Sequence, residues 1–333
     1  MPEREERLVF EVSWEVANKV GGIYTVLTGK APYAHQKYGD KYICIGPYVA
    51  QGRQNWEPVN RYAEWQAYVE RRHGLRVYPG LWKVSDIEIT TWLIEFHSLL
   101  GRKDEIFYEL WQHFGVDSLW GGWDYIEPAI FGYAAGLVIG SFMEFYYGAD
   151  EVEAVAHFHE WLTGAGVLYL RRYKPLVATV FTTHATVVGR AAEGHPVSLD
   201  PEEWASEHGI LAKYTLERAA WREADVTTTV SELIGEEAST YLDRSPDVIT
   251  PNGWNPPPKL NPHAGKAFLD MLLQVWGLSK EEPVFWLFHS GRPELVNKGT
   301  YDLLEAIQRY QGAPLSQVKL GLIIAMPADV AAP

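Results

Sequence analysis

The hydrophobic and polar positions of the chain form short apolar runs that alternate with longer segments of mixed polarity. Several runs are uninterrupted and rich in β-branched and aromatic residues, such as Val177-Ala178-Thr179-Val180-Phe181 and Leu320-Gly321-Leu322-Ile323-Ile324. Runs of this kind are typical of parallel strands that are covered on both faces. The strands predicted in this way span residues 7–12, 41–46, 75–78, 87–95, 153–158, 176–182, 225–230, 247–250, 283–289 and 318–325.

Segments with a helical pattern lie between many of these strands. They span residues 23–37, 125–147, 161–172, 209–223, 232–242, 263–276 and 299–310. Alternating strands and helices predict an α/β fold with doubly wound, Rossmann-like sheets. Segment 125–147 approaches the length of a membrane span, but Glu127, Pro128 and Glu144 interrupt it near its ends. We therefore interpret this segment as a buried helix and expect no membrane partner.

A proline-rich stretch marks a boundary. The turn signal Asn252-Gly253 and three prolines, Pro256 to Pro258, follow the strand predicted at 247–250. Such a stretch continues neither a helix nor a central strand. We therefore predict a first domain at residues 1–254, a hinge at 255–262 and the start of a second Rossmann-like domain at 263–333. Two strands and two helices are too few to cover their own faces, so the sequence reads as that of a truncated protein.

Composition and charge exclude several classes of protein. With 47% hydrophobic residues, the 333-residue chain can bury large cores, which excludes disordered and fibrous proteins. The net charge is −14 and the Lys and Arg residues are scattered, so we expect no nucleic-acid partner. Cys44 is the single cysteine and lies in an apolar run, which predicts a buried thiol in a reducing cytoplasm.

Five polar clusters follow predicted strands, and in open α/β sheets ligands bind off the carboxyl ends of the strands. The clusters are Gly21-Gly22; His157 to Trp161; Thr182 to Thr186 with Gly189-Arg190; Asn252-Gly253; and Ser290 to Arg292 with Asn297 to Gly299. Each cluster alone is a modest signal. Five clusters on one edge of a sheet would indicate a binding site.

The Gly21-Gly22 pair suits a bound anion. Glycine lets backbone N–H groups approach a ligand, and the amino-terminus of a following helix favours negative charge. The pair is not the dinucleotide fingerprint G-x-G-x-x-G, which argues against a nicotinamide cofactor. A plain tight turn remains the alternative. Arg292 and Lys298 flank a loop that leads into a predicted helix, where cations are unfavourable unless an anion is bound. They indicate a diphosphate, with ordinary solvated charge as the alternative.

His157 and His159 alternate along a predicted strand, so their side chains should share one face. With His184 they could form a metal site, a set of hydrogen-bonded histidines, or a sugar-binding or catalytic pocket. The chain contains no His-Glu-x-x-His and no Asp-x-Asp sequence, so a metal is the least favoured reading. We expect neither a metal nor a cofactor, and Arg and Lys would then neutralise a bound diphosphate.

Taken together, these motifs closely resemble those of glycogen synthases of the animal and fungal type. The resemblance is carried by EVANKVGGIYTVL at residues 15–27, HFHEWL at 157–162, FTTHAT at 181–186 with Gly189-Arg190, TPNG at 250–253, and Gly291-Arg292 with Asn297-Lys298-Gly299. The motifs are long, ordered and spread over nearly the whole chain.

The resemblance implies a GT-B architecture and a retaining transfer of glucose from UDP-glucose, or ADP-glucose, to glycogen or another α-1,4-glucan. Residues that would contact the substrates by motif are Gly21, Gly22, Asn252, Arg292 and Lys298. The resemblance implies that His159, Glu160, His184 and Arg190 are the catalytic residues and surround the transferred glucose. The resemblance also allows a homo-oligomer.

Two other functions stay open at this point. Family members continue well beyond the length of this chain, and their later half carries a pair of glutamates, one of them central to catalysis. A non-catalytic glucan or nucleotide-sugar binding module, or a relic fragment, is therefore the alternative. A metal hydrolase built on His157, His159 and His184 is a weaker one.

Overall fold

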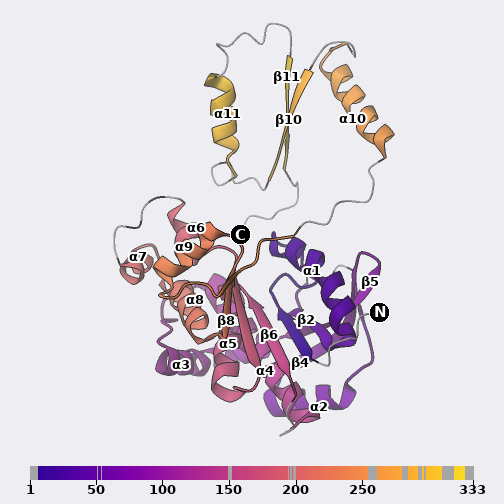
Figure 1. Cartoon of the computed structure of the whole chain (residues 1–333). Helices are drawn as coiled ribbons and strands as arrows, with labels where there is room; N and C mark the ends of the chain where they lie inside the picture. The colour runs from indigo at the N-terminus through magenta and orange to yellow at the C-terminus, as the bar shows by residue number, and fades with distance from the viewer. Residues whose placement is uncertain are drawn as a thin grey trace. The chain divides into compact units, whose positions relative to one another are not determined.

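The computed structural model describes residues 7–50, 52–53, 55–148, 152–193, 195, 197, 200–253, 261–279, 284–291, 295, 298–309 and 319–326. The chain divides into two compact units, Met1–Trp254 and Asn255–Pro333. Figure 1 shows the helices and strands of both units.

A nine-stranded sheet, in the order β3-β4-β5-β2-β1-β6-β7-β8-β9, forms the framework of the first unit. Its strands are β1 (Leu8–Val12), β2 (Tyr42–Pro47), β3 (Trp56–Pro58), β4 (Arg76–Val84), β5 (Ile87–Glu95), β6 (Ala154–His159), β7 (Ala178–Thr183), β8 (Val226–Thr229) and β9 (Val248–Ile249). The pairs from β5 to β9 are all parallel, whereas β4 runs antiparallel to β5 and β3 antiparallel to β4.

The helices of this unit follow the strands along the chain. They are α1 (Ile23–Tyr38), α2 (Ala63–His73), α3 (Lys103–Phe114), α4 (Trp123–Tyr146), α5 (Trp161–Tyr173), α6 (Val187–Ala192), α7 (Pro201–Glu207), α8 (Leu211–Glu223) and α9 (Glu232–Tyr241), with short 3₁₀ turns at Gly39–Lys41 and His97–Arg102.

The strand order reverses at β1. The chain leaves β1 through α1 and pairs β2 on one side, and β6 later joins β1 on the other side. The carboxyl ends of β1 and β6 therefore flank the point where connections depart in opposite directions, which is where open α/β sheets bind ligands.

Two hydrophobic cores stabilise the sheet. A smaller core packs α1 on the sheet through Leu27 and Ala31, together with Cys44 of β2, so the predicted burial of the thiol is confirmed. The larger core contains α4, α5 and α8. Among the described helices, α4 alone has the length and apolar composition of a membrane span, but 83% of its apolar window is buried inside the protein.

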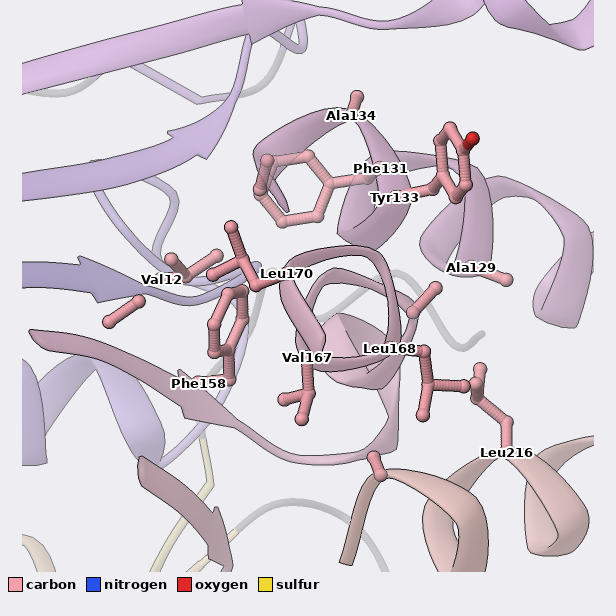
Figure 2. Packing of buried hydrophobic residues seen from close by; sticks show 14 of the residues in the cluster. Val12, Ala129, Phe131, Tyr133, Ala134, Phe158, Val167, Leu168, Leu170 and Leu216 are labelled. Carbon is pink, nitrogen blue, oxygen red and sulfur yellow. The ribbon is translucent and has the colours of Figure 1, made fainter. Parts of the chain in front are cut away.

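Helices α4 and α5 pack unusually close because glycines line their contact. A Cβ atom on Gly136 would lie 2.8 Å from the Gly166 carbonyl oxygen, and one on Gly166 would lie 2.6 Å from that of Gly132. Figure 2 shows α5 contributing Val167, Leu168 and Leu170 to the core beside Phe158 of β6. The direct backbone contact between α4 and α5 thus fixes the position of α5 against the sheet.

Most predicted strands and long helices are observed, within a few residues of their expected ends. The prediction missed β3, α2, α3, α6 and α7, and β4 is longer than the strand expected at 75–78. The reason for α2 and α3 is that each buries only two side chains, four residues apart, which leaves too narrow an apolar stripe.

The second unit contains a two-stranded parallel sheet of β10 (Val284–Ser290) and β11 (Lys319–Ala325), with helices α10 (Pro262–Val275) and α11 (Thr300–Arg309). Much of its apolar surface is exposed, including Phe285 and Phe288 at 58% and 69%. Residues 255–260 of the expected hinge lie outside the described residues, and the Asn261 side chain caps α10.

We expect Gly166→Ala to destabilise the chain by about 1–3 kcal/mol, because the added methyl group meets backbone of α4 and the Phe158 ring. Urea unfolding followed by tryptophan fluorescence measures this. Gly101→Ala is the control, since nothing lies within 4 Å of its new methyl group. Equal stability of the two variants would contradict the close helix contact.

Candidate functional site

Four of the five polar clusters lie on one edge of the nine-stranded sheet. They follow β1, β6, β7 and β9, which run parallel, so their carboxyl ends point the same way. The fifth cluster follows β10, which belongs to the second sheet. The expectation that five clusters share one edge was therefore wrong by one, because the fifth strand is not part of the same sheet.

A buried carboxylate that the sequence analysis missed lies at the centre of this edge. Glu11 of β1 is fully buried, and its Oε1 accepts hydrogen bonds from Lys30 Nζ at 2.7 Å and from His159 Nε2 at 2.6 Å. Its Oε2 accepts a hydrogen bond from the Tyr42 hydroxyl at 3.0 Å. The signal in the sequence was a lone charge inside the apolar run LVFEV.

The two histidines of β6 share one face, as predicted, with ring centroids 4.2 Å apart. His157 contacts Lys30 Nζ through Nδ1 at 2.9 Å and Thr182 Oγ1 through Nε2 at 2.6 Å. The Nδ1 atom of His159 lies 3.0 Å from Nε2 of His184, which follows β7. One hydrogen-bonded network thus crosses β1, β6 and β7.

These residues do not fit a metal ion. One ligand atom from each of Glu11, His157 and His159 lies within 4.8 Å of the others. The ammonium group of Lys30, however, contacts both Glu11 and His157, so the chain supplies its own cation at this position. His184, the third ligand of the metal hypothesis, is absent from the group and contacts His159.

The charge states follow from burial and from Lys30. Burial alone would raise the pKa of the Glu11 carboxyl, but the charge of Lys30 and the hydrogen bond from His159 hold that pKa well below its usual range. Burial and the charge of Lys30 lower the pKa of His157 well below its usual range. Burial, His159 and Arg190 lower the pKa of His184 to about 3. His157 and His184 are therefore neutral at pH 7, and Lys30 is the cation that balances Glu11.

Glu160 adopts a strained backbone directly after β6. Its φ of 66° and ψ of 164° fall in a region occupied almost only by glycine. Its N–H donates to the Thr182 carbonyl at 2.8 Å, and its buried carboxylate accepts from the N–H groups of His184 and Ala185 at 3.0 and 3.2 Å. Burial raises the pKa of Glu160, although Arg190, 3.7 Å away, acts against this. Strain held in place by this many bonds is typical of functional sites.

A third buried carboxylate holds the loop after β7 in place. Glu217 of α8 accepts from Thr183 Oγ1 at 2.5 Å and from the Val187 N–H at 2.8 Å. Thr186 caps α6 by accepting from the Gly189 N–H at 2.9 Å. The segment that carries His184 and leads to Arg190 is therefore fixed at each end.

A carboxylate also lies at the amino-terminus of α1, which begins at Ile23 as predicted. Glu15 accepts hydrogen bonds from the N–H groups of Gly21 and Tyr24, both at 2.8 Å. Nothing lies within 4 Å of the position where a Gly22 side chain would start. The turn is thus open to a ligand at Gly22 and already holds one negative group.

The remaining predicted site residues belong to other segments of the chain. Asn252 is exposed after β9. Lys298 is exposed in the turn before α11 of the second unit and packs beside Gly291. Arg292 and Asn297 lie outside the described residues. The structure therefore joins His159, Glu160, His184 and Arg190, and places Gly21, Gly22 and Asn252 on the same edge.

The glycogen synthase family model matches residues 11–261, which is most of the chain and nearly the whole first unit. The chain belongs to the glycogen synthase family. The resemblance inferred from the motifs is thereby confirmed.

Among individual glycogen synthases, the Dictyostelium discoideum enzyme is 32% identical over 353 residues, covering 96% of this chain and 39% of that protein. The human liver enzyme is 35% identical over 328 residues (92% and 46%), and that of Caenorhabditis elegans is 38% identical over 265 residues (76% and 39%). The chain thus spans less than half the length of these glycogen synthases.

Among solved structures, the catalytic domain of starch synthase IV from Arabidopsis thaliana, bound to ADP and acarbose, resembles this chain with a TM-score of 0.50 and 15% identity. The match covers 96% of this chain and 74% of that one. At this identity the likeness concerns the fold, and it confirms the expected α/β fold of the GT-B type.

The folding stability of this member of the glycogen synthase family should depend on pH through Glu217. Burial and the nearby charge of Glu160 raise the pKa of Glu217 in the folded protein to about 8. A raised acid pKa means that the folded state binds the proton more tightly, so stability is complete at low pH and is lost as pH rises towards about 8.

We expect Glu217→Gln, a neutral mimic of the protonated side chain, to be more stable than the parent at about pH 8–9 and similar to it at about pH 5. Urea unfolding across this range measures the difference. Glu236→Gln, the same change at an exposed position of α9, should follow the parent at every pH. A Glu217→Gln variant that loses stability equally at all pH values would refute the raised pKa.

Proposed function

We propose that this chain forms the acceptor-side domain and part of the donor site of a retaining glucosyltransferase. The reaction would transfer glucose from UDP-glucose to the non-reducing end of an α-1,4-glucan, as in glycogen synthesis. Family membership over residues 11–261 carries this proposal. The edge built around Glu160, His159 and His184 supports it, because strain and buried polar groups gather there.

The amino-terminus of α1 would receive the donor diphosphate beside Gly22. The N–H groups of Gly21 and Tyr24 bind the Glu15 carboxylate, which supports this proposal because the same end of the helix accommodates an anionic oxygen. Arg292 and Lys298 would stabilise the negative charge that develops on the departing UDP. No metal would be required, since these two side chains would supply the positive charge.

The residues around the transferred glucose would be His159, Glu160, His184 and Arg190, with Asn252 at the margin of the pocket. The Arg190 side chain is 61% exposed while its guanidinium lies 3.7 Å from the buried Glu160 carboxylate. Arg190 can therefore donate hydrogen bonds to a ligand without losing its counter-charge. Transition-state charge is best stabilised by groups that are held in advance in this way.

UDP-glucose is the proposed donor, with ADP-glucose as the alternative, and glycogen is the proposed acceptor. We place the protein in the cytoplasm and allow a homo-oligomer. A second candidate function is a glucan or nucleotide-sugar binding module without catalysis. The turn that is open at Gly22 would serve such a module as well as an enzyme.

Incorporation of labelled glucose from UDP-glucose into glycogen tests the proposal, for the chain alone and for a longer polypeptide that contains it. We expect Arg190→Ala to lower transfer at least about 100-fold, the cost of removing one fixed donor to a developing charge. Arg222→Ala is a matched control: Arg222 is 54% exposed, pairs with Asp243, and lies in the last turn of α8.

Equal transfer by the Arg190→Ala and Arg222→Ala variants would contradict the role of Arg190. Binding of glucan or UDP-glucose without transfer by either polypeptide would favour the binding module instead.

A further inference from the structure

An ion pair between a buried carboxylate and a partly exposed lysine supports the histidines at the proposed site but lies outside the motifs that carry the family resemblance. Lys30 Nζ lies 2.7 Å from Glu11 Oε1, and the two side chains are 39% and 0% exposed. Lys30 reaches this position from α1, while Glu11 lies on β1. Lys30 contacts His157 and Glu11 contacts His159, so the pair determines which nitrogen atoms of these histidines carry protons.

The hydrogen-bond partners fix which nitrogen of His159 carries a proton. An ionised carboxylate only accepts, so the 2.6 Å bond between Glu11 Oε1 and His159 Nε2 requires a proton on Nε2. A neutral imidazole carries one proton in total. The Nδ1 atom of a neutral His159 is therefore an acceptor.

The proton on His159 also determines which nitrogen of His184 carries a proton. The 3.0 Å bond between His159 Nδ1 and His184 Nε2 needs one donor and one acceptor. When His159 is neutral, His184 donates from Nε2, and its own Nδ1 carries a lone pair. If His159 gained a second proton, its Nδ1 would donate, and a neutral His184 would move its proton to Nδ1. The charge of His159 thus sets the polarity of His184 Nδ1.

Nδ1 of His184 is the end of this chain of bonds. No hydrogen bond reaches this atom from the part of the chain that the structure describes, and it is not one of the buried atoms there that lack a partner. This atom is therefore accessible to a ligand at the edge of the sheet where the strands have their carboxyl ends. Arg190, Glu11 and Lys30 are charged groups that act on His184.

Lys30 determines whether His159 is neutral or doubly protonated. A buried Glu11 carboxylate needs one positive counter-charge, and either Lys30 or a protonated His159 could supply it. Lys30 is in place at hydrogen-bond distance and also donates to His157, whose Nε2 then donates to Thr182 Oγ1. With the carboxylate balanced by Lys30, His159 needs no second proton.

We propose that Glu11 and Lys30 are positioning residues that keep His159 neutral, so that His184 presents an unprotonated Nδ1 to a hydroxyl group of the bound glucosyl unit. The hydroxyl as ligand rests on the proposed function. The tautomers themselves rest only on the contacts within the first unit.

Nitrogen NMR of ¹⁵N-histidine-labelled chain tests this directly, because protonated and unprotonated imidazole nitrogens resonate in separate regions. His159 and His184 are assigned by single substitutions to Asn. We expect protons on Nε2 and none on Nδ1 of both residues at about pH 7. A proton on Nδ1 of His184 in the parent chain would overturn the proposal, even if every variant failed to fold.

Lys30→Met removes the counter-charge and should transfer its role to His159. We expect His159 to become doubly protonated and the His184 proton to move to Nδ1. Lys30→Arg keeps the charge and should retain the parent tautomers. Lys37→Met, at an exposed position of the same helix, is the matched control and should change neither histidine. Parent tautomers in a folded Lys30→Met variant would overturn the role of Lys30.

Activity provides a separate readout. In a polypeptide that transfers glucose, we expect Lys30→Met to lower kcat/KM about 10- to 100-fold, because an acceptor for a substrate hydroxyl becomes a donor. Full activity of that variant would refute the role of the hydroxyl contact. Absence of transfer by every polypeptide would refute the proposed function, while the NMR result would still decide the tautomers.

Discussion

The buried Glu11 carboxylate is the interaction on which the proposed site depends. It lies on β1, where the order of strands reverses, and it is fully buried. A charge in that position is very costly unless it is paired and hydrogen-bonded. Lys30, His159 and Tyr42 meet this requirement from α1, β6 and β2. The need to neutralise one charge therefore ties three elements to β1 at the point where a ligand would bind.

Carboxylates have a second role along the same edge, as acceptors for backbone N–H groups. Glu15 accepts a hydrogen bond from the turn before α1. Glu160 accepts from the N–H groups of His184 and Ala185, and Glu217 accepts from that of Val187. Without these acceptors the Val187 donor would be buried without a partner, at a cost of about 1–3 kcal/mol, and the part-buried donors of the other loops would lose theirs. A site built in this way is organised before a substrate arrives, which suits transition-state stabilisation in a low-dielectric environment.

The sheet was predictable because its central strands are continuous apolar runs, and four polar clusters were correctly placed at the ends of β1, β6, β7 and β9. Helices α2 and α3 were missed since each buries only two side chains. The expectation that the fifth cluster shares this edge was wrong because the cluster follows a strand of the predicted second domain, and that strand belongs to a separate sheet.

The buried acids were harder to recognise for a related reason. Glu11 and Glu217 read as the solvated positions of a strand and a helix, since one charge among apolar residues normally faces water. Their partners are distant in the chain: Glu11 and His159 are 148 residues apart, and Glu217 and Thr183 are 34 apart. Such contacts depend on strand order and helix packing, which a single sequence does not display.

The ionisation of Glu11 tests this account most directly. The ¹³C signal of its carboxyl group, followed through a pH titration of the folded chain, reports when the group takes up a proton. If Lys30 and the hydrogen bonds outweigh burial, Glu11 stays ionised well below the pH at which an ordinary glutamate titrates. Protonation of Glu11 at or above that ordinary pH would contradict the account.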